Sequence, residues 1–234
     1  MNILRAKYEI QTPISEGGID ELKLIEKIAR TCYKSEDKIT EDGESAKKMV
    51  SALVKSGHEA MLEHSFLSVR FYIDRGVSHE AVRHRLFSFA QESTRYVNYS
   101  KDKYGNEINV IDISPCLAND PKMTNVDSDA LGAVYTEWLK AMKDAEQHYM
   151  NMIELGASPQ TARSVLPNST KTELNVSGNY REWRHFFKLR CDKAAHPQIR
   201  EVAIPLLKEL KEKIPIIFDD IEIDENFKLL GGQQ

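Results

Sequence analysis

Residues 83–96, RHRLFSFAQESTRY, combine three arginines with a histidine and several neutral hydrogen-bonding side chains. Arg83, Arg85 and Arg95 can make paired, charge-assisted hydrogen bonds to phosphate, because the guanidinium group is a planar fork. Gln91 and Ser93 add neutral donors and acceptors to the same segment. Basic clusters also occur as solvated surface, but the apolar run inside this one favours a site for a small anion.

A second basic cluster lies in NYREWRHFFKLR, residues 179–190. On a helix, Arg181, His185 and either Lys188 or Leu189 recur at intervals of three and four residues, so they share one face. The aromatic residues between them would pack in the core, while Asn179 could cap the helix or contact a ligand. An ordinary amphipathic helix is the alternative that this pattern leaves open.

Motifs for metal binding and covalent catalysis are not found in the sequence. HEAML at His58 lacks the second histidine of HExxH, and HEAVRH at His79 spaces its histidines one residue too far. No CxxC pair, GxSxG elbow, GxGxxG loop or P-loop is present. Cys191 is better interpreted as a small buried side chain than as a nucleophile. We therefore predict no metal site and no covalent nucleophile.

The elements that must position these clusters follow from hydrophobic periodicity. Alternation predicts strands over 2–10, 65–73 and 172–178, and a further strand after the Gly105-Asn106 turn. Helical spacing predicts a helix capped by Asp20, a short helix capped by Ser78 that carries the Arg-His-Arg triplet, and a helix bent or broken at Pro205. The other predicted helices cover 45–57, 128–155, a short segment from Ser158-Pro159, and 180–192. Residues 226–234 are expected to form a frayed tail.

Strands and helices do not alternate regularly, so the sequence predicts an α+β fold: one domain over residues 1–234, with a central, mostly antiparallel sheet flanked by helices. The composition is that of a globular protein, with 41% hydrophobic and 29% charged residues. A net charge of −4 argues against nucleic-acid binding. Three cysteines provide no disulfide framework, and no signal peptide or membrane span is evident, which predicts a cytoplasmic protein without a membrane partner.

The arginine-rich segment is similar to the signature of the flavin-dependent thymidylate synthases: Arg-His-Arg, seven residues, Ser, and an Arg two positions further on. Arg83, His84, Arg85, Ser93 and Arg95 match this signature without gaps. The resemblance continues through GHEAMLEHSF, ARSVLPNS and NYREWRHFFKLR in the family's order, and so covers most of the chain.

This resemblance implies a homotetramer with active sites at subunit junctions. It implies methylation of dUMP to dTMP, with the methylene group from methylenetetrahydrofolate and a hydride from reduced FAD that NADPH regenerates. The implied FAD contacts are His58, Arg83, His84, Arg85, Asn179, Arg181 and His185. The implied dUMP contacts are Glu80, Gln91, Ser93, Arg95, Arg163 and Arg190. Arg190 would be the catalytic residue, polarising the uracil ring without a covalent enzyme adduct.

Two other functions are compatible with parts of the pattern. A flavin reductase or oxidase would use the flavin contacts but would not need the arginines expected to bind the nucleotide. A module that binds single-stranded nucleic acid could stack bases on Phe87, Phe89 or Tyr96 between arginines, although the acidic chain disfavours it. The colour of the purified protein and its spectral response to dUMP would separate these three functions.

Overall fold

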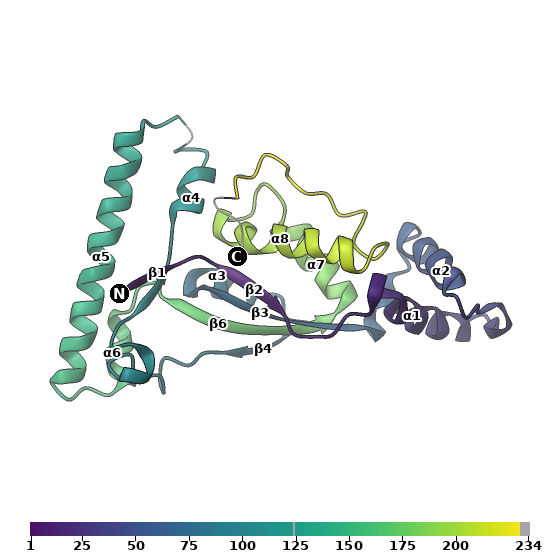
Figure 1. The fold of residues 1–234 in the computed structure, drawn as a ribbon, viewed down its shortest axis with the longest axis horizontal. Coiled ribbons are helices and arrows are strands. Elements are labelled where there is room, and N and C mark those ends of the chain that lie inside the picture. The colour runs from purple at the N-terminus through teal and green to yellow at the C-terminus, as the bar shows by residue number, and fades with distance from the viewer. Residues whose placement is uncertain (124, 230–234) are drawn as a thin grey trace.

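The computed structural model describes residues 1–123 and 125–229 and is built around a four-stranded antiparallel sheet (Figure 1). Its strands lie in the order β2 (Lys7–Ile10), β3 (Phe66–Asp74), β6 (Lys171–Asn179) and β4 (Ser88–Gln91). Burial alternates residue by residue along β3 and β6, as expected when one face of a sheet meets the core. The paired core positions include Val69 with Val176 and Phe71 with Leu174.

Helices α7 (Tyr180–Arg190) and α8 (Pro197–Lys213) cover the core face of this sheet (Figure 1). The aromatic side chains of α7 supply much of the packing, and Trp183, Phe186 and Phe187 are at most 2% exposed. Helices α1 (Ile19–Thr31) and α2 (Glu44–Lys55) extend the same core at one end of the molecule. The position of α7 is therefore fixed by burial of its apolar side, which leaves its basic side for the site.

The opposite end of the molecule is built from a smaller unit (Figure 1). Strands β1 (Asn2–Leu4) and β5 (Asn109–Ile111) form a parallel pair, and the long helix α5 (Ser128–Glu154) packs beside them. The short helix α6 (Pro159–Ala162) belongs to this part, whereas the short helix α4 (Ser114–Asn119) lies against α8. Short 3-10 turns lie at Glu16–Gly18, Glu36–Lys38, Glu59–His64, Asp102–Tyr104 and Arg163–Val165.

The predicted α+β class, with an antiparallel sheet flanked by helices, is confirmed. The long helix and the strands β3 and β6 also lie within one or two residues of their predicted bounds. Among residues 1–123 and 125–229, no helix combines the length and apolar character needed to cross a bilayer. The end of the expected frayed tail, residues 230–234, lies outside the described residues.

Four local predictions were wrong. The strand predicted over 2–10 is divided between two sheets, because the chain leaves the β1–β5 pair at Arg5 and joins the main sheet at Lys7. The cap of α1 is Gly18, one residue before the helix begins, rather than Asp20. The predicted break at Pro205, one of the two outcomes expected there beside a bend, does not occur, because Pro205 lies within one helix assigned from Pro197 to Lys213.

The fourth correction concerns the helix next to the arginine-rich segment. Helix α3 (Arg75–Ala81) is capped by Asp74, whose Oδ1 accepts a hydrogen bond from the Val77 N–H at 2.6 Å, whereas Ser78 lies buried within the helix. The helix ends at Ala81, so residues 83–85 lie after the helix instead of on it. Strand β4 then begins inside the same segment, at Ser88, which the sequence analysis did not predict.

Candidate active site

The two basic clusters predicted from the sequence meet in one cleft, which we call the α7 cleft. It has a volume of about 1060 Å³ and lies between the exposed side of α7 and the segment after α3. Its lining includes most of the residues expected to contact flavin, namely Arg83, His84, Arg85, Asn179, Arg181 and His185, together with Arg190. The predicted shared face of Arg181, His185 and Lys188 is confirmed, because all three line the cleft.

A hydrogen bond joins the two clusters at the floor of the cleft. The Nε of Arg190 donates to Nε2 of His84 over 3.0 Å. His84 is only 5% exposed and lies against the ring of Phe186. Burial lowers the pKa of His84 to about 4, and the charges of Arg190 and His185 act in the same direction. His84 is therefore a neutral acceptor at neutral pH, held against an arginine that remains charged.

Glu80 holds the other side of the Arg190 guanidinium. The Arg190 NH2 donates to the backbone oxygen of Glu80 over 3.2 Å, and the NH1 lies 3.6 Å from the Glu80 carboxylate. Nδ1 of His196, at the start of α8, lies 3.4 Å from the second carboxylate oxygen. The guanidinium is thus oriented from two sides, and its side chain is 19% exposed at the cleft.

The remaining residues of the cleft differ in how exposed they are and in whether they already bind another side chain. Arg83, Arg85 and His185 are exposed. Arg181 is bound to Glu63, with 2.5 Å between its NH1 and the carboxylate oxygen. The Asn179 oxygen caps α7 by accepting the backbone N–H of Glu182, so one of its two predicted roles is confirmed. His58 is exposed in the turn before residues 59–64 and lines a separate hollow beside α2, outside the α7 cleft.

A second basic hollow, of about 510 Å³, lies near the start of α3 and contains Arg163 and Arg75. One Arg163 nitrogen donates to the hydroxyl of Thr94 over 3.4 Å. The NH1 of Arg75 is buried and has no hydrogen-bond partner among the described residues. An unpaired buried guanidinium nitrogen next to a second arginine is suited to an anion that completes its hydrogen bonds. Sequence reasoning missed Arg75, because only the fold brings it to Arg163.

The other residues expected at the nucleotide are close to this hollow or point away from it. Nε of Arg95 donates over 2.9 Å to Gln160, which lines the hollow. Ser93 accepts a longer hydrogen bond, 3.4 Å, from the backbone N–H of Arg95. The Gln91 amide is directed inward and donates to Ser78 over 2.9 Å. The structure therefore places Arg95 beside the hollow that contains Arg163, while Gln91 braces the end of β4 against α3.

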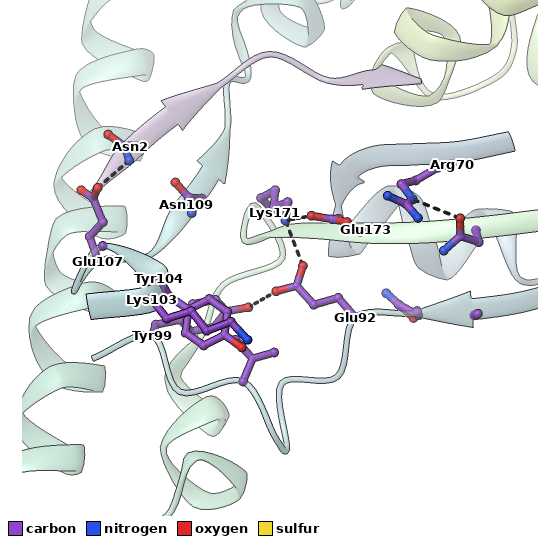
Figure 2. Close-up of a pocket in the computed structure, with 15 residues that line it drawn as sticks. Asn2, Arg70, Glu92, Tyr99, Lys103, Tyr104, Glu107, Asn109, Lys171 and Glu173 are labelled. Carbon is purple, nitrogen blue, oxygen red and sulfur yellow. Dashed lines mark hydrogen bonds and ion pairs between the residues drawn. The ribbon is translucent and has the colours of Figure 1, made fainter. Parts of the chain in front are cut away.

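A third hollow, of about 720 Å³, lies on the uncovered face of the sheet (Figure 2). At its centre Lys171 is paired with two carboxylates: it lies 3.0 Å from Glu92 and 2.7 Å from Glu173, and the Tyr99 hydroxyl donates to Glu92 (Figure 2). Burial alone would lower the pKa of Lys171, but the hydrogen bonds and charges of Glu173 and Glu92 outweigh it, so the pKa is raised. This internally paired group is less suited to an anion than the other two hollows.

His84, Glu182 and His185 also form a group whose potential ligand atoms lie within 4.8 Å of one another. The hydrogen bond from Arg190 leaves the proton of neutral His84 on Nδ1, facing Glu182. A metal at Nδ1 would require that proton to leave and would add positive charge beside an arginine. The prediction that the chain has no metal site is not tested by this geometry, but a proton on Nδ1 disfavours a metal at that atom.

Comparison with known proteins connects these sites to a family. The family model described as "Thymidylate synthase complementing protein" matches residues 19–216. The flavin-dependent thymidylate synthase of Corynebacterium aurimucosum is 34% identical over 93% of this chain and 87% of its own length. The chain is a member of the flavin-dependent thymidylate synthase family. The protein of the same name in Mycobacterium avium is 37% identical over 86% of this chain and 79% of its own length.

The fold of this family member also occurs in a solved structure. The UMP/dUMP methylase PolB from Streptomyces cacaoi, bound with 5-Br dUMP, superimposes with a TM-score of 0.76. The match covers 94% of this chain and 96% of the methylase chain, at 23% sequence identity. At that identity the likeness establishes the fold alone. The ligands of this chain must therefore be argued from its own side chains.

Proposed function

We propose that this protein methylates dUMP to dTMP, using methylenetetrahydrofolate as the carbon donor and reducing equivalents from NADPH. The observation that carries the proposal is the 3.0 Å hydrogen bond between His84 and Arg190. It joins a residue expected at the flavin to the residue expected at the pyrimidine, so both ligands would meet in the α7 cleft. The enzyme family to which the chain belongs supports this reaction.

The α7 cleft fits a flavin dinucleotide by size and by charge. Its volume of about 1060 Å³ suits a large ligand, and exposed Arg83 and Arg85 can bind a pyrophosphate group. When bound, FAD supplies the hydride chemistry that no amino-acid side chain provides. The protein's own contribution is to bind the cofactor through these arginines and Arg181, and to orient it against the aromatic floor. His58, which lies outside the cleft, would need a different part of the cofactor or a neighbouring subunit.

The hollow around Arg163 and Arg75 would bind the phosphate of dUMP. Helix α3 connects this hollow to the α7 cleft, because Arg75 begins the helix and Glu80, near its end, holds Arg190. A nucleotide that lies along α3 could place its phosphate at one end and its uracil at the other. Ser93 and Arg95 are proposed to assist at the phosphate, whereas Glu80 and Gln91 would act mainly by positioning α3 and Arg190.

Arg190 is proposed as the catalytic residue. Its guanidinium is held by Glu80 and His84 before substrate arrives, so it can stabilise negative charge that develops on the uracil ring without reorganisation. This polarisation makes C6 of the uracil ring a better acceptor of hydride. Ser93, whose hydroxyl oxygen accepts a hydrogen bond from the backbone N–H of Arg95, is assigned to binding and not to covalent attack.

A homotetramer belongs to the same proposal. Leu86 and Leu189 line the α7 cleft and are 77% and 48% exposed. Apolar side chains at the mouth of a polar cleft are suited to contact with another subunit. Light scattering of the purified protein checks this assembly: four times the 26.8 kDa chain mass is expected.

The proposal is tested by the visible spectrum of the purified protein. We expect a bound flavin whose absorbance bands shift when dUMP is added, because the two ligands share one cleft. A flavin spectrum that ignores dUMP, with NADPH oxidation that needs no dUMP, would indicate a flavin reductase or oxidase. A colourless protein that binds single-stranded DNA would indicate the nucleic-acid module.

A further inference from the structure

The two ring nitrogens of His84 face different partners. Nε2 accepts a hydrogen bond from Arg190 over 3.0 Å, and Nδ1 lies 3.4 Å from Oε1 of Glu182. The side chains of His84 and Glu182 are only 3% and 6% exposed, so water is largely excluded from this contact. Glu182 has no assigned role in the cofactor or nucleotide sites described above.

The bond from Arg190 shows where the His84 proton lies. Arginine is always a donor, so Nε2 must be the acceptor and the neutral ring must carry its proton on Nδ1. Nδ1 is buried and has no regular hydrogen bond among the described residues, although the Glu182 carboxylate is nearby. If the proton moved to Nε2, two donors would face each other, and Arg190 would lose its bond to His84 and be held by Glu80 alone.

We propose that Glu182 is a positioning residue that keeps the His84 proton on Nδ1 and thereby orients Arg190 towards the pyrimidine. The proposal rests on the proposed function for the identity of the ligand at Arg190, whereas the tautomer is a property of the protein itself. Burial raises the pKa of Glu182, with the charge of His185 opposing the rise. An N–H donor beside a carboxylate that is largely removed from water stabilises its charged form.

A purely structural role for Glu182 must be separated from this one. Glu182 lies in the first turn of α7, where a negative charge stabilises a helix. Its backbone N–H also satisfies the Asn179 cap, but that bond is kept in any substitution except proline. The variant Glu182→Gln removes the charge and keeps an acceptor, whereas Glu182→Ala removes both.

The experiment measures the His84 tautomer and the kinetics of the same proteins. Wild type, Glu182→Gln and Glu182→Ala are labelled with ¹⁵N-histidine, and proton–nitrogen correlations identify which His84 nitrogen is protonated; His84→Gln assigns the signal. We expect the Nδ1–H tautomer in wild type and in Glu182→Gln, and a mixture in Glu182→Ala. The kcat/KM for dUMP should fall about 10–100-fold in Glu182→Ala, the range for losing an orienting partner, and stay within about threefold of wild type in Glu182→Gln.

An unchanged tautomer with unchanged kinetics in Glu182→Ala would overturn the proposal. Equal losses in the Gln and Ala variants would also overturn it, because they would assign the effect to helix charge. Glu137→Ala, an exposed glutamate on α5, controls for general effects of removing a carboxylate. Wild-type protein that forms no dTMP would refute the proposed function, while the tautomer comparison would still decide the role of Glu182.

Discussion

Replacing Arg190 by alanine is the perturbation that separates chemistry from cofactor binding. The substitution removes the guanidinium that is anchored by His84 and Glu80 at 3.0 and 3.2 Å. Loss of one preorganised donor of this type costs about 10²–10³ in kcat, or about 2.7–4 kcal/mol of transition-state stabilisation. We therefore expect dTMP formation to fall at least about 100-fold. Flavin should remain bound, because its proposed contacts are the exposed arginines across the cleft.

Stability also changes, and the size of that change can be bounded. Without Arg190, the buried Nε2 of His84 has no donor, which costs about 1–3 kcal/mol of unfolding free energy. The assay therefore combines three measurements on each variant: dTMP formation, flavin content from absorbance, and thermal melting. Melting shows whether a lost activity reflects unfolding, and flavin content shows whether the cofactor site survives.

Two companion variants make the result specific. Arg190→Lys keeps the charge but cannot bind His84 and Glu80 at once, so it should recover only part of the lost rate. Arg181→Ala, in the same cleft, should show the opposite pattern, with loss of flavin and little direct effect on dUMP. If Arg190→Ala lost its flavin and kept its affinity for dUMP, the assignment of Arg190 to the pyrimidine would be refuted.

The other predictions address binding and stability. Arg163→Ala should raise the KM for dUMP about tenfold or more, since a hydrogen bond to a charged group contributes about 1.5–3 kcal/mol. An unchanged KM would show that the phosphate of dUMP binds at another site. Ser93→Ala should weaken dUMP binding but keep measurable turnover; a complete chemical block with normal binding would restore Ser93 as a nucleophile. Burial raises the pKa of Glu201 to about 7, above the 4.5 of an exposed glutamate. The protonated Glu201 side chain therefore stabilises the folded protein fully below pH 4.5, and this stabilisation is lost as the pH rises through 7. Glu201→Gln should therefore flatten the fall of melting temperature between pH 5 and 8, and equal slopes in both proteins would contradict this origin. Gly178→Ala would place a Cβ 2.1 Å from the Phe87 ring, so we expect a loss of about 1–3 kcal/mol or more in unfolding free energy, and an unchanged denaturation midpoint would contradict this packing.

The sequence was sufficient for the elements that strong periodicity controls. The alternation in β3 and β6 and the long pattern of α5 correspond to the structure within one or two residues. Helix starts were less predictable, because Asp74 and Ser78 are both good capping residues and only the register of β3 decides between them. Strand β4 was missed because four residues inside a charged motif form a strand only when β6 is beside them.

In the site too, contacts between residues close in sequence were predictable, whereas contacts between distant segments were not. The shared face of Arg181, His185 and Lys188 follows from helical spacing, and the structure places all three in the α7 cleft. The contact between His84 and Arg190 joins residues 106 positions apart, so no spacing rule could give it. Arg75 and Glu182 were missed for the same reason, because their neighbours come from other parts of the chain.

The central claim is that the α7 cleft and the hollow around Arg163 form one site for methylation of dUMP. The most direct test follows the release of tritium from dUMP labelled at C5, with purified flavin-loaded protein, methylenetetrahydrofolate and NADPH. We predict that release is matched by dTMP formation, needs both co-substrates for turnover, and falls at least about 100-fold in Arg190→Ala. Continued NADPH oxidation without any release of tritium would contradict the account.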